Sequence, residues 1–114
     1  MLWSITCAPC RQEFELLAEI KKAHLAMPLV LIATDDIVDK RLAGEVLGRY
    51  GLEREPSWIF AEPDVQRLRY EIDPSWYGEM PRAYFYDADH RREAVSGSLQ
   101  REQVKHWLAR IKAG

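Results

Sequence analysis

Two cysteines three residues apart, Cys7 and Cys10, are the side chains in this sequence whose type and spacing suit chemistry best. They are the only cysteines in the chain, and they enclose Ala8 and Pro9. Thiols at this spacing can close a small disulfide with little backbone movement. At the start of a helix, unpaired N–H groups and the helix dipole stabilise a thiolate, and an early proline costs no hydrogen bond. The motif therefore predicts redox chemistry, with Cys7 as the attacking, more exposed sulfur and Cys10 as the partly buried, resolving one.

Two other interpretations of the cysteines stay open. A zinc site needs two further ligands at matching spacing, whereas His24, His90 and His106 are scattered singly along the chain. Buried cysteines with a purely structural role are common in small domains, but that role does not explain a pair around a proline. Redox chemistry is the interpretation that the spacing favours, and no metal site is predicted.

The composition is typical of one globular domain that covers residues 1–114. A chain of 114 residues has little room for a second core. It carries 16 Lys and Arg against 18 Asp and Glu, which argues against nucleic acid or an anionic membrane as an obligate partner. The longest apolar run, 25–33, contains Pro28 and is too short to span a bilayer. No export signal is recognisable at the start of the sequence.

Alternating helices and strands are expected to position the cysteine motif. The periodicity predicts helices at 8–26, 38–50, 63–72 and 99–112 and strands at 28–34, 57–61, 82–87 and 92–96, after a stub at 1–4. The residues expected to be buried include Trp3, Phe14, Leu17, Leu25, Val38, Leu42 and Trp58. Gly51 is the expected stop of the second helix, Pro63 the first residue of the third and Ser98 the N-cap of the last. This order predicts an α/β domain.

Two segments of the sequence resemble a known family. Residues 2–14, LWSITCAPCRQEF, resemble the F-W-A-S-W-C-x-P-C-x-x-E-x segment of TlpA/ResA-type thiol-disulfide oxidoreductases. Residues 78–87, GEMPRAYFYD, resemble the cis-proline segment, strand and turn of the same proteins. The resemblance spans nearly the whole chain. It implies a thioredoxin-like fold: a central mixed sheet flanked by helices, with a strand-helix insertion at about 57–72 and a shortened first strand.

The resemblance also assigns roles to individual residues. Cys7 and Cys10 match the redox pair, and Pro81 matches the cis-proline that faces the disulfide and whose backbone pairs with an extended substrate segment. A cis Met80–Pro81 bond would explain a proline just before a strand that otherwise looks central. Glu13 matches an acidic residue near the redox pair. It is expected to shuttle a proton for the Cys10 thiol, or alternatively to be a first-turn glutamate stabilised by the helix dipole.

Other residues near the motif have less specific expectations. Met80, Pro9 and Trp76 are expected on the substrate-binding surface with Pro81. Trp76 and Tyr77 both precede the proline and could line that surface, but aromatic side chains in such loops more often serve in packing. Arg82, next to Pro81, could meet acidic groups of a substrate or face water. His90 lies in the turn of the predicted hairpin and is expected to be solvated.

The sequence departs from the family pattern near its start. Thr6 replaces the aromatic residue that usually precedes the first cysteine, and Met1 stands where thioredoxin has a buried carboxylate. Only the end of the strand that leads into the motif is present. We therefore expect an N-terminally truncated chain whose natural start, with a strand and an export or anchor segment, lies upstream. As given, the chain is expected to be marginally stable or to borrow a strand from a second copy.

Together these patterns predict a dithiol–disulfide oxidoreductase that reduces protein disulfides. Electrons would come from a partner thiol protein, without a metal or organic cofactor. By resemblance the location is periplasmic or extracytoplasmic, with a membrane tether only in a lost N-terminal segment. Two alternatives stay open: a catalytically inactive thioredoxin-like binding module, and a peroxiredoxin-like peroxide reductase. The second usually needs a Thr-x-x-Cys element, and Thr6, directly before Cys7, does not fit that spacing.

Overall fold

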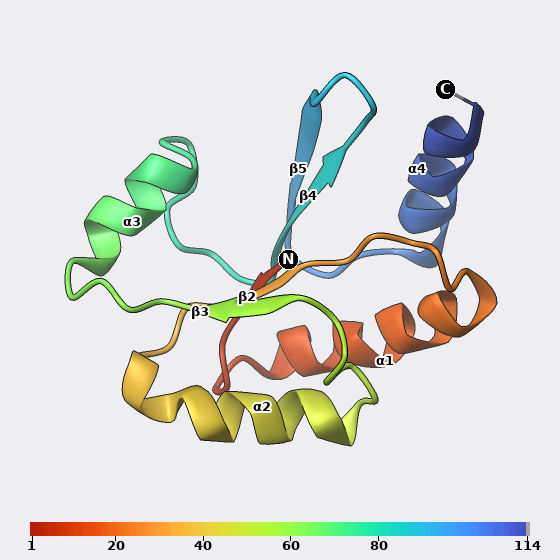
Figure 1. Ribbon diagram of the computed structural model, residues 1–114. Coiled ribbons are helices and arrows are strands. Elements are labelled where there is room, and N and C mark those ends of the chain that lie inside the picture. The colour runs from red at the N-terminus through yellow and green to blue at the C-terminus, as the bar shows by residue number, and fades with distance from the viewer. Residues whose placement is uncertain (114) are drawn as a thin grey trace.

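The computed structural model describes residues 1–113 as a mixed five-stranded sheet flanked by helices. The strands are β1 (Leu2–Trp3), β2 (Leu31–Ala33), β3 (Ser57–Ile59), β4 (Arg82–Tyr86) and β5 (Arg92–Ser96). The helices are α1 (Ala8–Ala23), the short 3₁₀ turn η1 (Ile37–Asp39), α2 (Lys40–Arg49), α3 (Val65–Ile72) and α4 (Arg101–Ala113). Figure 1 shows α1 and α2 side by side along the sheet, with α3 and α4 on either side of the β4–β5 hairpin. The predicted α/β class and mixed sheet are confirmed.

The strand order β3-β2-β1-β4-β5 places β1 in the centre of the sheet. β1 runs parallel to β2, pairing Leu2 with Ile32 and Trp3 with Ala33, and antiparallel to β4 through Leu2 and Arg82 alone. The N-terminal residues 1–4, which lead into the cysteine motif, therefore lie between β2 and β4. An apolar pocket of about 430 Å³ lies next to β1, and it is lined by β4, by α1 and α4 and by the segment that leads into β2.

Successive residues of a strand point to opposite faces of the sheet, and β1 supplies one core residue to each. Trp3 packs in a cluster with Phe14 of α1 and Val46 of α2, whereas Leu2 packs with Phe60 and Trp76 on the side of α3. The rings of Trp3 and Phe14 meet edge to face with centroids 4.9 Å apart. Trp3 and Phe14 are thus buried as predicted. A further cluster joins α1 and α4 to the inner face of β4.

The first two helices are shorter than their apolar patterns predict. α1 ends at Ala23, so Leu25 lies beyond it and is 79% exposed. Asp36 accepts a hydrogen bond from the Val38 N–H and caps the separate turn η1. As a result Val38 is not on the buried face of α2 and is 82% exposed, and Leu42 is exposed as well. Gly51, with φ +73°, follows the end of α2 as predicted.

Strands β2 and β3 differ from their predictions in length and burial. β2 covers three residues instead of 28–34, and Val30 before it is 45% exposed. β3 pairs with β2 alone among the described residues and forms an edge of the sheet. Trp58 on this edge strand is 69% exposed, so its predicted place in the core is wrong. β4 and β5 form the predicted hairpin, and His90 in its turn is exposed.

Two predicted helix starts are also corrected. Asp64 caps α3 by accepting a hydrogen bond from the Arg67 N–H, so Pro63 lies before the helix. α4 begins at Arg101, and Ser98 is therefore too far upstream to be its N-cap. No helix among residues 1–113 is long and apolar enough to cross a membrane.

Candidate active site

Cys7 and Cys10 form a disulfide at the N-terminus of α1. Their Cα atoms are 5.3 Å apart. Cys7 is the N-cap residue, and its Sγ accepts a hydrogen bond from the Cys10 N–H at 3.2 Å. Cys7 is partly exposed, whereas Cys10 is 0% exposed. The two sulfurs therefore have the unequal access that the sequence predicts, and only Cys7 lies within reach of an incoming molecule.

The segment that leads into Cys7 is fixed by Asp35, which lies two residues beyond the end of β2. The Asp35 carboxylate accepts hydrogen bonds from the Ser4 hydroxyl at 3.0 Å and from the Ile5 N–H at 3.1 Å. Arg11 of α1 donates to the Ile5 carbonyl at 2.6 Å. These contacts hold the chain segment before Cys7 against both β2 and α1. Asp35 was assigned no role from the sequence, and the signal available for it was a carboxylate directly after the apolar run that forms β2.

Glu13 is buried one turn beyond Cys10 on the same side of α1. The residue is 3% exposed. One carboxylate oxygen, Oε1, accepts a hydrogen bond from the Leu99 N–H, and Oε2 has no partner among the described residues. Burial raises the pKa of Glu13 above its ordinary value. The alternative of a dipole-stabilised first-turn glutamate is wrong, because the first turn of α1 contains no acidic residue.

The Met80–Pro81 peptide bond is cis and lies directly before β4. The Met80 side chain packs against the same cluster as Cys7 and accepts a hydrogen bond from the Thr34 hydroxyl at its sulfur, 3.4 Å away. The Pro81 carbonyl accepts from the Gly97 N–H at 2.8 Å. Within residues 1–113, no hydrogen bond engages the backbone N–H or C=O of Met80. Met80, rather than Pro81, therefore offers backbone groups for pairing with an extended segment.

The other predicted substrate-binding residues have different environments. Pro9 is exposed in the first turn of α1, next to the cysteines. Trp76 is 3% exposed, and its indole N–H donates to the Glu79 carbonyl at 2.8 Å. A side chain so buried has almost no surface for a substrate, so the predicted contact is wrong and the packing alternative holds. The adjacent Tyr77 is 84% exposed, so the packing expectation is wrong for this residue.

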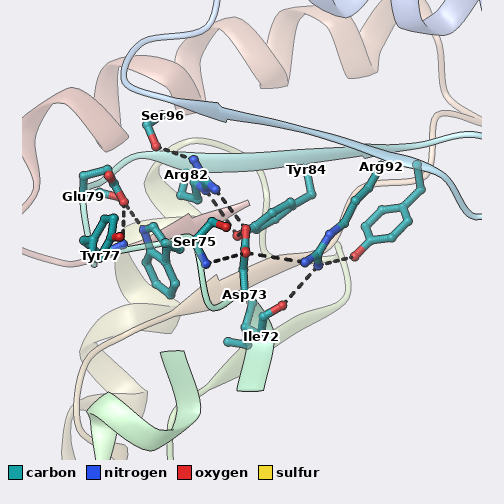
Figure 2. Close-up of polar contacts among 11 residues, drawn as sticks. Ile72, Asp73, Ser75, Tyr77, Glu79, Arg82, Tyr84, Arg92 and Ser96 are labelled. Atoms are coloured by element: carbon teal, nitrogen blue, oxygen red, sulfur yellow. Dashed lines mark hydrogen bonds and ion pairs between the residues drawn. The ribbon is translucent and has the colours of Figure 1, made fainter. Parts of the chain in front are cut away.

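Arg82 forms an ion pair with Asp73, so it neither faces water nor is available to an acidic group of a substrate (Figure 2). The Asp73 carboxylate accepts hydrogen bonds from the Arg82 guanidinium, the Tyr84 hydroxyl and the Ser75 N–H, each at 2.9 Å. The Arg82 side chain is 11% exposed. The Ser75 N–H, together with Tyr84 and Arg82, holds the pKa of Asp73 below its ordinary value. Both expectations for Arg82 are thus wrong.

No set of three or more His, Cys, Asp or Glu side chains in the described part of the chain could hold a metal ion. The site comprises a dithiol–disulfide pair, a buried carboxyl group one turn beyond Cys10 on α1, and Met80 backbone groups without a hydrogen bond in residues 1–113. Such groups can exchange thiols for disulfides and move a proton.

No protein-family model and no curated protein sequence matches the chain. Solved structures do match it. A secreted Mycobacterium tuberculosis disulfide oxidoreductase homologous to Escherichia coli DsbE has 22% identity and a TM-score of 0.69, over 95% of this chain and 76% of its own. The M. tuberculosis protein DsbF has 14% identity and a TM-score of 0.74, over 96% and 76%.

StoA from Bacillus subtilis has 16% identity and a TM-score of 0.65, over 94% of this chain and 78% of its own. At identities this low, the structural similarity establishes the fold alone. The chain accordingly has the thioredoxin-like fold that the sequence predicts, with a pair of cysteines at the start of its first helix.

Proposed function

We propose that this protein is a TlpA/ResA-type thiol-disulfide oxidoreductase that reduces protein disulfides through Cys7 and Cys10. The observation that carries the proposal is a disulfide at a helix N-terminus whose two sulfurs differ in exposure, within a thioredoxin-like fold. A helix N-terminus favours the thiolate form of a capping cysteine. The likeness to a secreted disulfide oxidoreductase supports an extracytoplasmic location.

In the proposed reaction the reduced protein attacks first with Cys7. Its thiolate forms a bond to one sulfur of the client disulfide, and the other client sulfur leaves as a thiolate that takes up a proton. Cys10 then loses its proton and attacks the Cys7 sulfur. The second client sulfur leaves, and the Cys7–Cys10 disulfide closes. Two electrons pass to the client, and a partner thiol protein restores the dithiol by the reverse exchange.

Glu13 is the proposed acceptor of the Cys10 proton. Cys10 and Glu13 are both buried on the same side of α1, and no other carboxylate lies among the buried residues of this helix. A raised pKa matches Glu13 to proton transfer with a thiol better than an ordinary carboxylate. Met80 is proposed to pair with an extended segment of the client through its backbone groups, which have no hydrogen bond in residues 1–113.

Insulin reduction tests the proposal directly. The wild type should catalyse reduction of insulin disulfides by dithiothreitol, and Cys7→Ser should abolish this activity because the attacking sulfur is lost. Cys7→Ser with wild-type activity would refute the assignment. A matched control is Ser57→Ala, since Ser57 is an exposed residue on the far edge of the sheet.

The reduction potential of the Cys7–Cys10 pair tests the direction of the reaction. Proline at the third motif position resembles the reducing members of the family, so we expect a value nearer to about −270 mV than to about −120 mV. A value at the oxidising end would reverse the proposed direction. If no disulfide forms reversibly, the chain is a thioredoxin-like binding module, and peroxide consumption that depends on Cys7 would instead indicate a peroxide reductase.

A further inference from the structure

The loop from Asp73 to Pro81 connects α3 to β4 and ends at the free backbone edge of Met80. Hydrogen bonds within the loop close it on itself: the Trp76 N–H donates to the Asp73 carbonyl at 3.0 Å, and the Trp76 indole donates to the Glu79 carbonyl. The Tyr77 N–H donates to the Glu79 carboxylate at 3.0 Å. The loop thus has a defined shape of its own, with Trp76 as its buried anchor and Tyr77 as its exposed tip.

Asp73, at the start of this loop, is bonded to β4, the strand that follows the loop. The bonds from Arg82 and Tyr84 cross from β4, immediately after Pro81, to the Asp73 carboxylate. From β5, Arg92 lies 3.8 Å from the same carboxylate and donates to the Ile72 carbonyl at 3.1 Å. Figure 2 shows the Asp73 carboxylate between the side chains of Arg82, Tyr84 and Arg92. One buried carboxylate therefore sets the separation of the two loop ends.

A contact from α3 fixes the tip of the loop. Arg69 donates to the Tyr77 carbonyl at 3.2 Å, and its guanidinium lies against Gly78. A Cβ atom at Gly78 would be 2.0 Å from Arg69 Nη1, and the residue has φ +91°. The tip is therefore held from both sides while the Tyr77 ring points into solvent, three residues before Met80.

We propose that Asp73 is a positioning residue that holds the Tyr77–Met80 segment in a preformed shape for client proteins. The proposal rests on the proposed function. In this proposal a protein client pairs with the Met80 backbone and contacts the exposed Tyr77 ring while its disulfide reaches Cys7. A loosened loop would therefore weaken client binding. A small disulfide needs access to Cys7 alone and does not sense the loop.

The test compares these two kinds of substrate in Asp73→Asn, with insulin as the protein and 5,5′-dithiobis(2-nitrobenzoate) as the small disulfide. We expect the KM for insulin to rise about tenfold, with kcat nearly unchanged. Asp73→Asn weakens hydrogen bonds to a charged group, and the free energy of such bonds corresponds to about a tenfold change in binding. The rate with the small disulfide and the reduction potential should stay at wild-type values. Asp89→Asn, which removes the same charge from the exposed hairpin turn, should leave all four quantities unchanged.

Tyr84→Phe is the second variant, because it keeps the arginine–carboxylate pair and removes one hydrogen bond to Asp73. It should raise the KM for insulin a few-fold without affecting the small disulfide, and it decides the matter if Asp73→Asn does not fold. Equal losses on both substrates, or an unchanged KM for insulin in folded variants, would overturn the positioning role while leaving the proposed function intact. A wild type inactive on both substrates would overturn both.

Discussion

The buried carboxyl group of Glu13 gives the protein a pH-dependent stability that an amide at this position removes. Burial raises the folded-state pKa of Glu13 above its ordinary value of 4.5. The folded protein therefore binds this proton more tightly than the unfolded chain does. The resulting contribution to stability is complete below pH 4.5 and is lost as the pH rises through the folded-state pKa.

The size of the effect follows from linkage. Between the unfolded and folded pKa values of Glu13, the free energy of unfolding falls by up to about 1.4 kcal/mol per pH unit. Glu13→Gln keeps an oxygen that can accept the hydrogen bond from the Leu99 N–H, and it carries no charge at any pH. The stability of the variant relative to the wild type should therefore increase with pH above 4.5 and level off past the folded pKa.

Urea unfolding of the oxidised proteins from pH 4 to pH 8 measures this difference. Glu15→Gln is the matched control, because Glu15 is an exposed residue on the same helix. Its curve should run parallel to that of the wild type over the whole range. If the curves of Glu13→Gln and the wild type also run parallel, burial does not disfavour the charged form of Glu13, and the argument for its role with Cys10 fails.

Three further predictions follow from the site and the core. Cys10→Ser should trap a mixed disulfide between Cys7 and the client, visible as a mass adduct that dithiothreitol removes; absence of the adduct would contradict the resolving role of Cys10. Phe14→Ala should lower the free energy of unfolding by about 3–5 kcal/mol, because Phe14 is 0% exposed; a loss below that range would mean that the cluster closes around the gap. Gly44→Ala should raise it by about 1 kcal/mol, since an added Cβ in α2 meets nothing within 4 Å; a destabilised variant would contradict that geometry.

Features that depend on local sequence could be predicted well. The placement of Cys7 at a helix start follows from the proline two residues later, and the β4–β5 hairpin follows from two alternating runs around a polar turn. The burial of Phe14 follows from helical periodicity. Each of these signals lies within a few residues of the structure that it specifies.

Features that depend on tertiary position could not be predicted. Apolar character alone does not say that the strand carrying Trp58 lies at an edge of the sheet, or that Leu25 falls beyond the end of its helix. The pairing of Arg82 with Asp73 crosses the loop between α3 and β4, and no spacing rule in the sequence marks it. Glu13 was identified through resemblance, but its burial against Leu99 depends on where α4 docks.

The central place of β1 has a consequence for the order in which the fold forms. Leu2 pairs with Ile32 on one side and with Arg82 on the other, so its two neighbours lie far along the chain. Closing such distant contacts costs loop entropy before any pairing compensates for it, and folding slows as contacts become less local. During synthesis the β1–β2 pair can form early, but the sheet stays open at β1 until β4 has emerged. The strand that leads into helix α1 is therefore paired on both sides only after β4 has docked.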